Sequence, residues 1–202
     1  MPTVLIVAPS HDTATSYTSL GAKAVEEYFD RKGWRIMTLY GARAVRERLE
    51  RVASKADMIV YIGHGKKDRW YGQLPQGFGT PLLDRSNIDV LRGKVVLTIA
   101  CFAGQMGEVA IRRDAKVYIG WRDVVYVGGL EQGYNYVKDF MHTFLELALD
   151  IADGKPVRVA VEDYRLLCQH YESYYEREKP MFWDVYRNYM RHNRINIVVF
   201  RS

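Results

Sequence analysis

The chain has 202 residues and a mass of 23.4 kDa, a length typical of a single domain. Apolar residues make up 48% of it and charged residues 26%, which excludes a disordered chain and supplies a substantial core. Lys and Arg number 29 and Asp and Glu 24, so the net charge of +5 is compatible with an anionic partner without requiring one. The two cysteines, Cys101 and Cys168, are too few for a disulfide scaffold and favour a reducing compartment.

The first residues are not expected to form a targeting segment. They include no positively charged stretch, and the apolar run 4–8 is too short for the core of a signal peptide. No run approaches the roughly 18 apolar residues of a membrane span. Arginines between residues 43 and 51 alternate with glutamates, as on a solvated helix face. We therefore expect a soluble, cytoplasmic protein that binds neither membrane nor nucleic acid.

Short apolar runs rich in Val and Ile recur along the chain. Runs that are apolar on both faces are typical of buried parallel strands. Six of them predict strands, at residues 4–8, 36–40, 58–62, 95–101, 117–120 and 195–200. Between the first three runs, apolar stripes at helical spacing predict helices over 17–33, which Gly33 ends, and over 42–52.

The second half of the chain adds a loop and two long helices. Glycines and prolines predict that most of 66–94 is loop, with a short helix near 87–91, and helices follow over 130–153 and 156–178. This order predicts a three-layer, doubly wound α/β fold with a mostly parallel sheet of about six strands. We expect one domain, 1–202, in which 155–202 is a helical C-terminal part with a final edge strand.

Two chemically reactive side chains follow neighbouring strands of this sheet. In open α/β sheets, ligands bind beyond the carboxyl ends of the strands. His64 follows the third strand, and Cys101 ends the fourth. Adjacent strands lie about 4.8 Å apart, so the two side chains can face each other. A thiol becomes a useful nucleophile near neutral pH when a base is beside it, which makes this pair a candidate catalytic dyad.

Glycines on both sides of His64 favour the same interpretation. Gly63 and Gly65 leave room for a substrate and keep backbone N–H groups accessible. The N–H groups of Gly65 and Cys101 could together hold the oxyanion of a tetrahedral intermediate. A turn after a strand suits this role because its N–H groups are not used by the sheet.

These two segments resemble the caspase-like cysteine peptidases, among them caspases, gingipains and CHAT-domain proteases. An apolar strand ending in His-Gly stands at 59–65, and one ending in Ala-Cys at 95–101. The similarity continues through 115–121 and into 154–160, and covers about residues 3 to 167. The resemblance implies a caspase-like fold and a dyad of Cys101 and His64 without an obligatory third acid. Ala103 departs from the serine that many members have, and no acidic processing segment is recognisable.

In such peptidases, the end of the first strand and the segment after the fifth help to form the specificity pocket. Asp12 and Asp123 are the matching acidic positions and could bind a substrate Arg or Lys. Trp121 could line the same pocket, whereas Arg122 would favour an acidic substrate residue. Other roles stay open, because Asp12 could be the N-cap of the first helix and Trp121 a core residue.

The leading hypothesis is a cysteine endopeptidase that cleaves peptide bonds, possibly after a basic residue. One alternative is a catalytically inactive caspase-like module that binds a peptide or protein; another is a thiol hydrolase acting on small amides. The other histidines show no metal-ligand spacing, and no phosphate-binding glycine motif follows the first strand. We therefore expect no metal and no cofactor.

Overall fold

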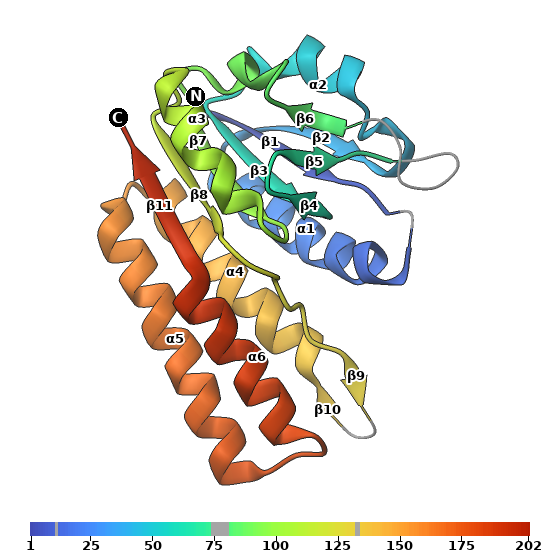
Figure 1. Cartoon of the computed structure of the whole chain (residues 1–202), viewed down its shortest axis with the longest axis vertical. Helices are drawn as coiled ribbons and strands as arrows, with labels where there is room; N and C mark the ends of the chain where they lie inside the picture. Colours follow the sequence, from blue (N-terminus) through green and yellow to red (C-terminus); the bar gives the residue numbers. More distant parts are fainter. Residues whose placement is uncertain (11, 74–80, 132–133) are drawn as a thin grey trace. The chain divides into compact units, whose positions relative to one another are not determined.

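The computed structural model of the chain describes residues 1–10, 12–73, 81–131 and 134–202. Its contacts divide the chain into two compact units. The sheet unit comprises Met1–Val124 and Val198–Ser202, and the helical unit comprises Val125–Ile197 (Figure 1). We expected the helical part to begin at residue 155, so the observed unit starts 30 residues earlier, at Val125.

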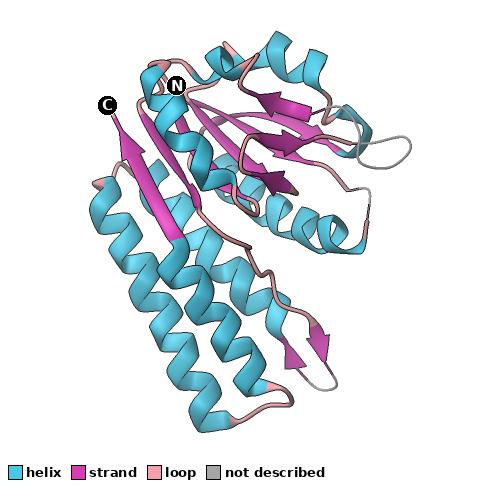
Figure 2. Cartoon of the chain, viewed as in Figure 1, coloured by secondary structure: helices cyan, strands magenta, loops and turns pink. Residues whose placement is uncertain are grey.

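The sheet unit is an α/β structure with a six-stranded central sheet in the order β11-β8-β7-β3-β1-β2 (Figure 2). The strands are β1 (Thr3–Ala8), β2 (Arg35–Tyr40), β3 (Met58–Ile62), β7 (Val95–Ile99), β8 (Val117–Trp121) and β11 (Ile197–Arg201). All pairs from β2 to β8 are parallel. Ser202 N–H donates to Lys116 O, so the end of β11 meets the start of β8 and β11 runs antiparallel. The expected mostly parallel sheet is confirmed.

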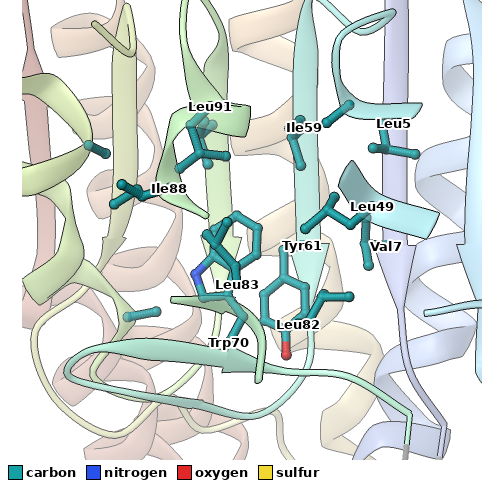
Figure 3. Close-up of a cluster of buried hydrophobic side chains, with 14 of the residues drawn as sticks. Leu5, Val7, Leu49, Ile59, Tyr61, Trp70, Leu82, Leu83, Ile88 and Leu91 are labelled. Carbon is teal, nitrogen blue, oxygen red and sulfur yellow. The ribbon is translucent and has the colours of Figure 1, made fainter. Parts of the chain in front are cut away.

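Helices cover both faces of this sheet. The helices of the unit are α1 (Thr13–Arg31), α2 (Arg46–Ala53) and α3 (Gly107–Arg112), with 3-10 turns η1 (Gly41–Arg43), η2 (Ile88–Leu91) and η3 (Ala103–Met106). α1 packs against β1, β2 and β3. Leu5 and Val7 on the other face join a core that includes Leu49 of α2 (Figure 3). Because Val4 and Ile6 are as fully buried as Leu5 and Val7, neither face of β1 is open to solvent.

The segment 66–94 differs from the expected loop. It contributes to a second, antiparallel sheet made of β4 (Gly65–Lys66), β5 (Arg69–Tyr71) and β6 (Pro81–Asp84). Residues 74–80 lie outside the described ranges. Trp70, Leu82 and Leu83 of this small sheet are buried in the same core as Leu5 and Val7 (Figure 3). Their burial explains why a stretch rich in glycine and proline still forms strands. The short helix expected near 87–91 is present as η2.

The helical unit contains three helices, one more than expected, and a short hairpin. They are α4 (Tyr136–Ala152), α5 (Val157–Glu178), α6 (Trp183–Asn196), β9 (Leu130–Glu131) and β10 (Tyr134–Asn135). The helix expected over 130–153 begins only at Tyr136, because the Asn135 side chain accepts from Lys138 N–H and caps it. Residues 132–133 of that expectation lie outside the described ranges. Within those ranges, no helix combines the length and apolar character that crossing a bilayer requires.

A buried carboxylate lies inside the helical unit. Asp139 of α4 is 8% exposed, and its Oδ2 accepts hydrogen bonds from Tyr134 at 2.8 Å and from Tyr175 at 2.9 Å. Burial raises the pKa of Asp139 above its ordinary value, and the two hydroxyl hydrogen bonds only partly offset this. We refer to these three residues as the tyrosine–aspartate cluster. It is a structural arrangement of the unit's interior.

Candidate active site

The candidate site lies at the carboxyl ends of β1, β3 and β7. β1 has β2 on one side and β3 on the other, so the winding of the sheet reverses between β1 and β3. In open α/β sheets such a reversal opens a crevice between the loops that leave the two strands. Asp12 follows β1 and His64 follows β3, so these two residues lie on either side of that crevice.

The register of β3 and β7 brings the segments of His64 and Cys101 together. Ile62 is paired with Ile99, and Gly63 N–H donates to Ile99 O at 3.1 Å. His64 comes two residues after Ile62, and Cys101 comes two residues after Ile99. The two residues therefore occupy equivalent positions in the segments that follow these adjacent strands. His64 and Cys101 are both partly exposed, as side chains that receive a substrate must be.

Asp12 has two roles in the structure. Its side chain caps α1 by accepting from Thr15 N–H at 2.8 Å, which confirms the N-cap interpretation. Its Oδ2 also lies 2.6 Å from His64 Nε2, a contact that the sequence analysis did not anticipate. Desolvation alone would raise the pKa of Asp12, but the hydrogen bonds from Thr15 and His64 outweigh it and lower the pKa to about 2. Asp12 is therefore ionised near neutral pH.

The ionised carboxylate fixes how His64 is protonated. A carboxylate can only accept a hydrogen bond, so the proton of a neutral His64 ring is on Nε2. Nδ1 is then the basic nitrogen of the ring. The carboxylate also fixes the orientation of the ring, as the third group of a catalytic triad does.

The N–H of Gly65 points away from the small sheet. Tyr71 N–H donates to His64 O, so the pair Gly65–Trp70 in the β4–β5 ladder is of the non-hydrogen-bonded kind. A Cβ on Gly65 would lie 2.7 Å from Cys101 O, so only glycine allows this approach to the turn after β7. Gly65 and the turn after β7 are therefore in close contact.

The turn that carries Cys101 is tightly constrained. Phe102 directly after it has φ of 59°, in the left-handed region that side chains other than glycine seldom occupy. Its N–H donates to Asp123 O at 2.8 Å, and Gln105 Nε2 donates to Arg122 O at 3.0 Å. Local strain of this kind persists where surrounding bonds hold it. The turn after β7 and the segment after β8 are therefore tied together.

The three residues expected to form a specificity pocket differ in their surroundings. Trp121 is fully buried, which favours the core role over contact with a substrate. Arg122 is exposed, and Asp123 is half-buried with Oδ1 accepting from Val124 N–H. Asp12 accepts from Thr15 and contacts His64, so both acidic positions have partners in the structure.

The second cysteine differs from the first. Cys168 on α5 is fully buried in the helical unit, and burial raises the pKa of its thiol to about 12. Its surroundings are those of an interior packing residue. Neither cysteine forms a disulfide.

Two other kinds of ligand site are a metal centre and a pocket away from the strand ends. In the part of the chain that the structure describes, no three His, Cys, Asp or Glu side chains come together as metal ligands. A pocket of about 320 Å³ lies in the helical unit. Lys155 Nζ lies there 2.6 Å from Asp150 and 2.7 Å from Asp163, so these two carboxylates of the pocket already share a cation.

No protein-family model matches the chain, and no curated protein matches its sequence.

Proposed function

We propose that the protein is a cysteine peptidase in which Cys101 attacks a peptide carbonyl and His64 transfers the protons. The observation that carries this proposal is the register of β3 and β7, which gives His64 and Cys101 equivalent positions beyond the paired Ile62 and Ile99. The hydrogen bond from His64 Nε2 to Asp12 supports it further, because a carboxylate that accepts from one ring nitrogen orients the other as a base.

The proposed reaction proceeds in two halves. His64 takes the proton of the Cys101 thiol, and the sulfur attacks the carbonyl carbon while Gly65 and Cys101 N–H groups bind the oxyanion. The C–N bond then breaks, and His64 gives its proton to the leaving amine. In the second half, His64 removes a proton from water, which attacks the thioester and releases the acid and the thiol. Asp12 orients the His64 ring throughout.

We expect the substrate to be a peptide or protein with a basic residue before the cleaved bond. Asp123, which follows β8 and is half-buried, is the acidic position that the resemblance matches to the specificity pocket. Because the nucleophile acts only as a reduced thiol, we expect a reducing compartment such as the cytoplasm.

Labelling with acyloxymethyl ketone peptides tests the proposal. Such probes alkylate an activated thiol, so we expect Cys101 to be modified and the Cys168 control thiol to remain intact, as judged by peptide mass mapping. Probes with Lys or Arg next to the reactive group should react faster than a probe with Asp. Cys101→Ala should lower cleavage of a peptide library by at least about 10³-fold. Cys168→Ala is the matched control and should retain cleavage.

The same measurements separate the alternatives. Equal cleavage by the wild type and Cys101→Ala contradicts a cysteine peptidase. A peptide that binds equally well to the wild type, Cys101→Ser and His64→Ala, with no turnover, favours an inactive binding module. Turnover of small amides without cleavage of any peptide favours the small-molecule hydrolase.

A further inference from the structure

Three buried aromatic residues lie behind the candidate site. They are Tyr61 of β3, Trp70 of β5 and Tyr118 of β8, each fully buried, and we call them the aromatic network. The rings of Tyr61 and Trp70 stack at 4.6 Å and 6°, and Figure 3 shows them side by side. Trp70 Nε1–H donates to the Tyr118 hydroxyl at 3.2 Å. The network thus spans the interior from β3 to β8.

One end of the network holds the segment of His64. The Tyr61 hydroxyl lies 2.6 Å from His64 O and 2.7 Å from Tyr71 O, so its single proton is shared between two carbonyls. Tyr71 N–H donates to His64 O as well. A Cβ on Gly63 would lie 2.7 Å from the Tyr61 hydroxyl, so the glycine is what lets the hydroxyl reach the loop.

The other end holds the turn of Cys101. The Tyr118 hydroxyl accepts from Trp70 and donates to Ala103 O at 2.8 Å. Ala103 follows Cys101 by two residues, and Phe102 between them has the left-handed φ of 59°. The Ala103 carbonyl is therefore fixed directly beyond the strained residue.

We propose that Tyr61, Trp70 and Tyr118 are positioning residues, which hold the His64 loop and the Cys101 turn at a fixed separation. The inference rests on the proposed function, because it names what keeps the base and the nucleophile in place. The network acts through backbone carbonyls of both segments and lies outside the reach of any substrate. Small displacements matter here, since a shift of about 1 Å can cost about 10²-fold in rate.

The hydroxyl groups themselves point to positioning. Phenylalanine at 61 and 118 would fill nearly the same space without burying a polar atom. Buried hydroxyls are costly unless they are hydrogen-bonded, and both of these bond to carbonyls in the two segments of the site. Burial raises the pKa of Tyr61 well above its ordinary value, so it stays a neutral donor over the working range of the site.

The test removes each hydroxyl and measures Cys101 directly. Tyr61→Phe and Tyr118→Phe are compared with the wild type in the pH profile of Cys101 alkylation by iodoacetamide, followed by peptide mass mapping. Each variant should lower the ratio of the rate near pH 6 to the rate near pH 10 by at least about threefold, because a displaced His64 activates the thiol less. With a peptide substrate, kcat should fall about tenfold and KM should stay within about twofold.

Two control variants remove comparable bonds elsewhere. Tyr136→Phe deletes a buried hydroxyl that donates to Met181 O at 2.8 Å in the helical unit. Lys94→Met deletes a buried donor to Ala56 O at 2.8 Å in the sheet unit, at the start of β7 and thus at the opposite end of that strand from Cys101. Both should lower thermal stability while leaving the alkylation profile and kcat unchanged.

The outcomes distinguish the inference from the function it rests on. Tyr61→Phe and Tyr118→Phe variants that melt earlier but keep the wild-type alkylation profile and kcat overturn the inference alone. The same is true if the controls alter the profile as much as the two test variants. A wild-type Cys101 whose profile matches that of the chain unfolded in guanidinium chloride overturns the proposed function, and the inference with it.

Discussion

Each unit of the molecule contains an aspartate that accepts hydrogen bonds from two residues, and the two environments shift the pKa of the carboxylate in opposite directions. Asp12 in the sheet unit is 43% exposed, contacts a ring nitrogen of His64 and has its pKa lowered to about 2. Asp139 in the helical unit is 8% exposed, accepts from two tyrosine hydroxyls and has its pKa raised. The first environment favours the charge, and the second disfavours it.

The contrast shows what separates a candidate reactive centre from a buried polar cluster. Both carboxylates accept two or more hydrogen bonds, so the number of bonds does not distinguish them. The difference lies in access to solvent and in the partner, which is a histidine ring nitrogen for Asp12 and two tyrosine hydroxyls for Asp139. Each of the following predictions disturbs one side of this comparison and leaves the other intact.

The largest effect is expected from Gly65→Ala. Its Cβ would lie 2.7 Å from Cys101 O and 3.0 Å from Ala100 Cβ, so the two segments must move apart. We expect the labelling rate of Cys101 to fall by about 10²-fold, with no change in the hydrogen exchange of α4 in the helical unit.

Gly107→Ala is the matched control for that change. The added Cβ would lie 2.1 Å from the Phe200 ring, so this variant also crowds the sheet unit. Overpacking of this kind costs about 1–3 kcal/mol in the free energy of unfolding. If Gly107→Ala reduces the labelling rate of Cys101 as strongly as Gly65→Ala does, the effect of Gly65→Ala comes from a general loss of stability and not from separation of the two segments.

A smaller effect is expected from Asp12→Asn. Asparagine caps a helix about as well as aspartate, so α1 keeps its N-cap while His64 loses its anionic partner. We expect labelling of Cys101 near pH 7 to fall about tenfold, because an amide can donate as well as accept and so no longer fixes which ring nitrogen carries the proton.

The same variant should also change how stability depends on pH. A carboxyl whose pKa is lower in the folded state contributes stability above its ordinary pKa of 3.8, and this is lost as the pH falls towards about 2. The wild type should exceed Asp12→Asn by about 1 kcal/mol near pH 6, a value reduced by solvent screening of this exposed group. Denaturant melts across that range measure the difference. If the difference in the free energy of unfolding between the wild type and Asp12→Asn stayed constant down to pH 2, this would contradict the lowered pKa of Asp12.

The smallest effect, with the opposite sign, is expected from Asp139→Asn. A carboxyl whose pKa is raised in the folded state costs stability as the pH rises through and above its ordinary pKa of 3.8. The amide oxygen can still accept from Tyr134 and Tyr175, so near pH 7 the variant should be as stable as the wild type or up to about 1 kcal/mol more stable. Hydrogen exchange in α4 measures this. If the stability of Asp139→Asn relative to the wild type increased as the pH is lowered, this would refute the raised pKa of Asp139.

The strands that carry the site could be predicted from the sequence because they are buried on both faces. Continuous apolar runs located β1, β3 and β7 with ends within two residues, and the parallel order then brought His64 and Cys101 to one edge. The contact between Asp12 and His64 could not be predicted. It depends on how the Asp12 and His64 side chains are oriented beyond the ends of β1 and β3, which no pattern along the chain encodes.

Two other elements escaped prediction for reasons of composition. The small sheet is short and interrupted by glycine and proline, and its burial comes from Trp70 and Leu83 packing on residues distant in sequence. α6 buries Tyr186, Met190 and Asn193, a set too mixed in character to form an apolar stripe. Tyr61 is the penultimate residue of the apolar strand β3. A polar hydroxyl in such an apolar run was the sequence feature that could have indicated the aromatic network.

The antiparallel strand β11 has a consequence for how the protein forms during synthesis. Residues 198–202 leave the ribosome only after the whole helical unit has been made, yet they complete the sheet beside β8. Until then β8 presents an unpaired edge, which is a template for pairing with another chain. The nascent sheet unit is therefore most prone to aggregate while the helical unit is being translated, and a chaperone that shields β8 would act in that interval.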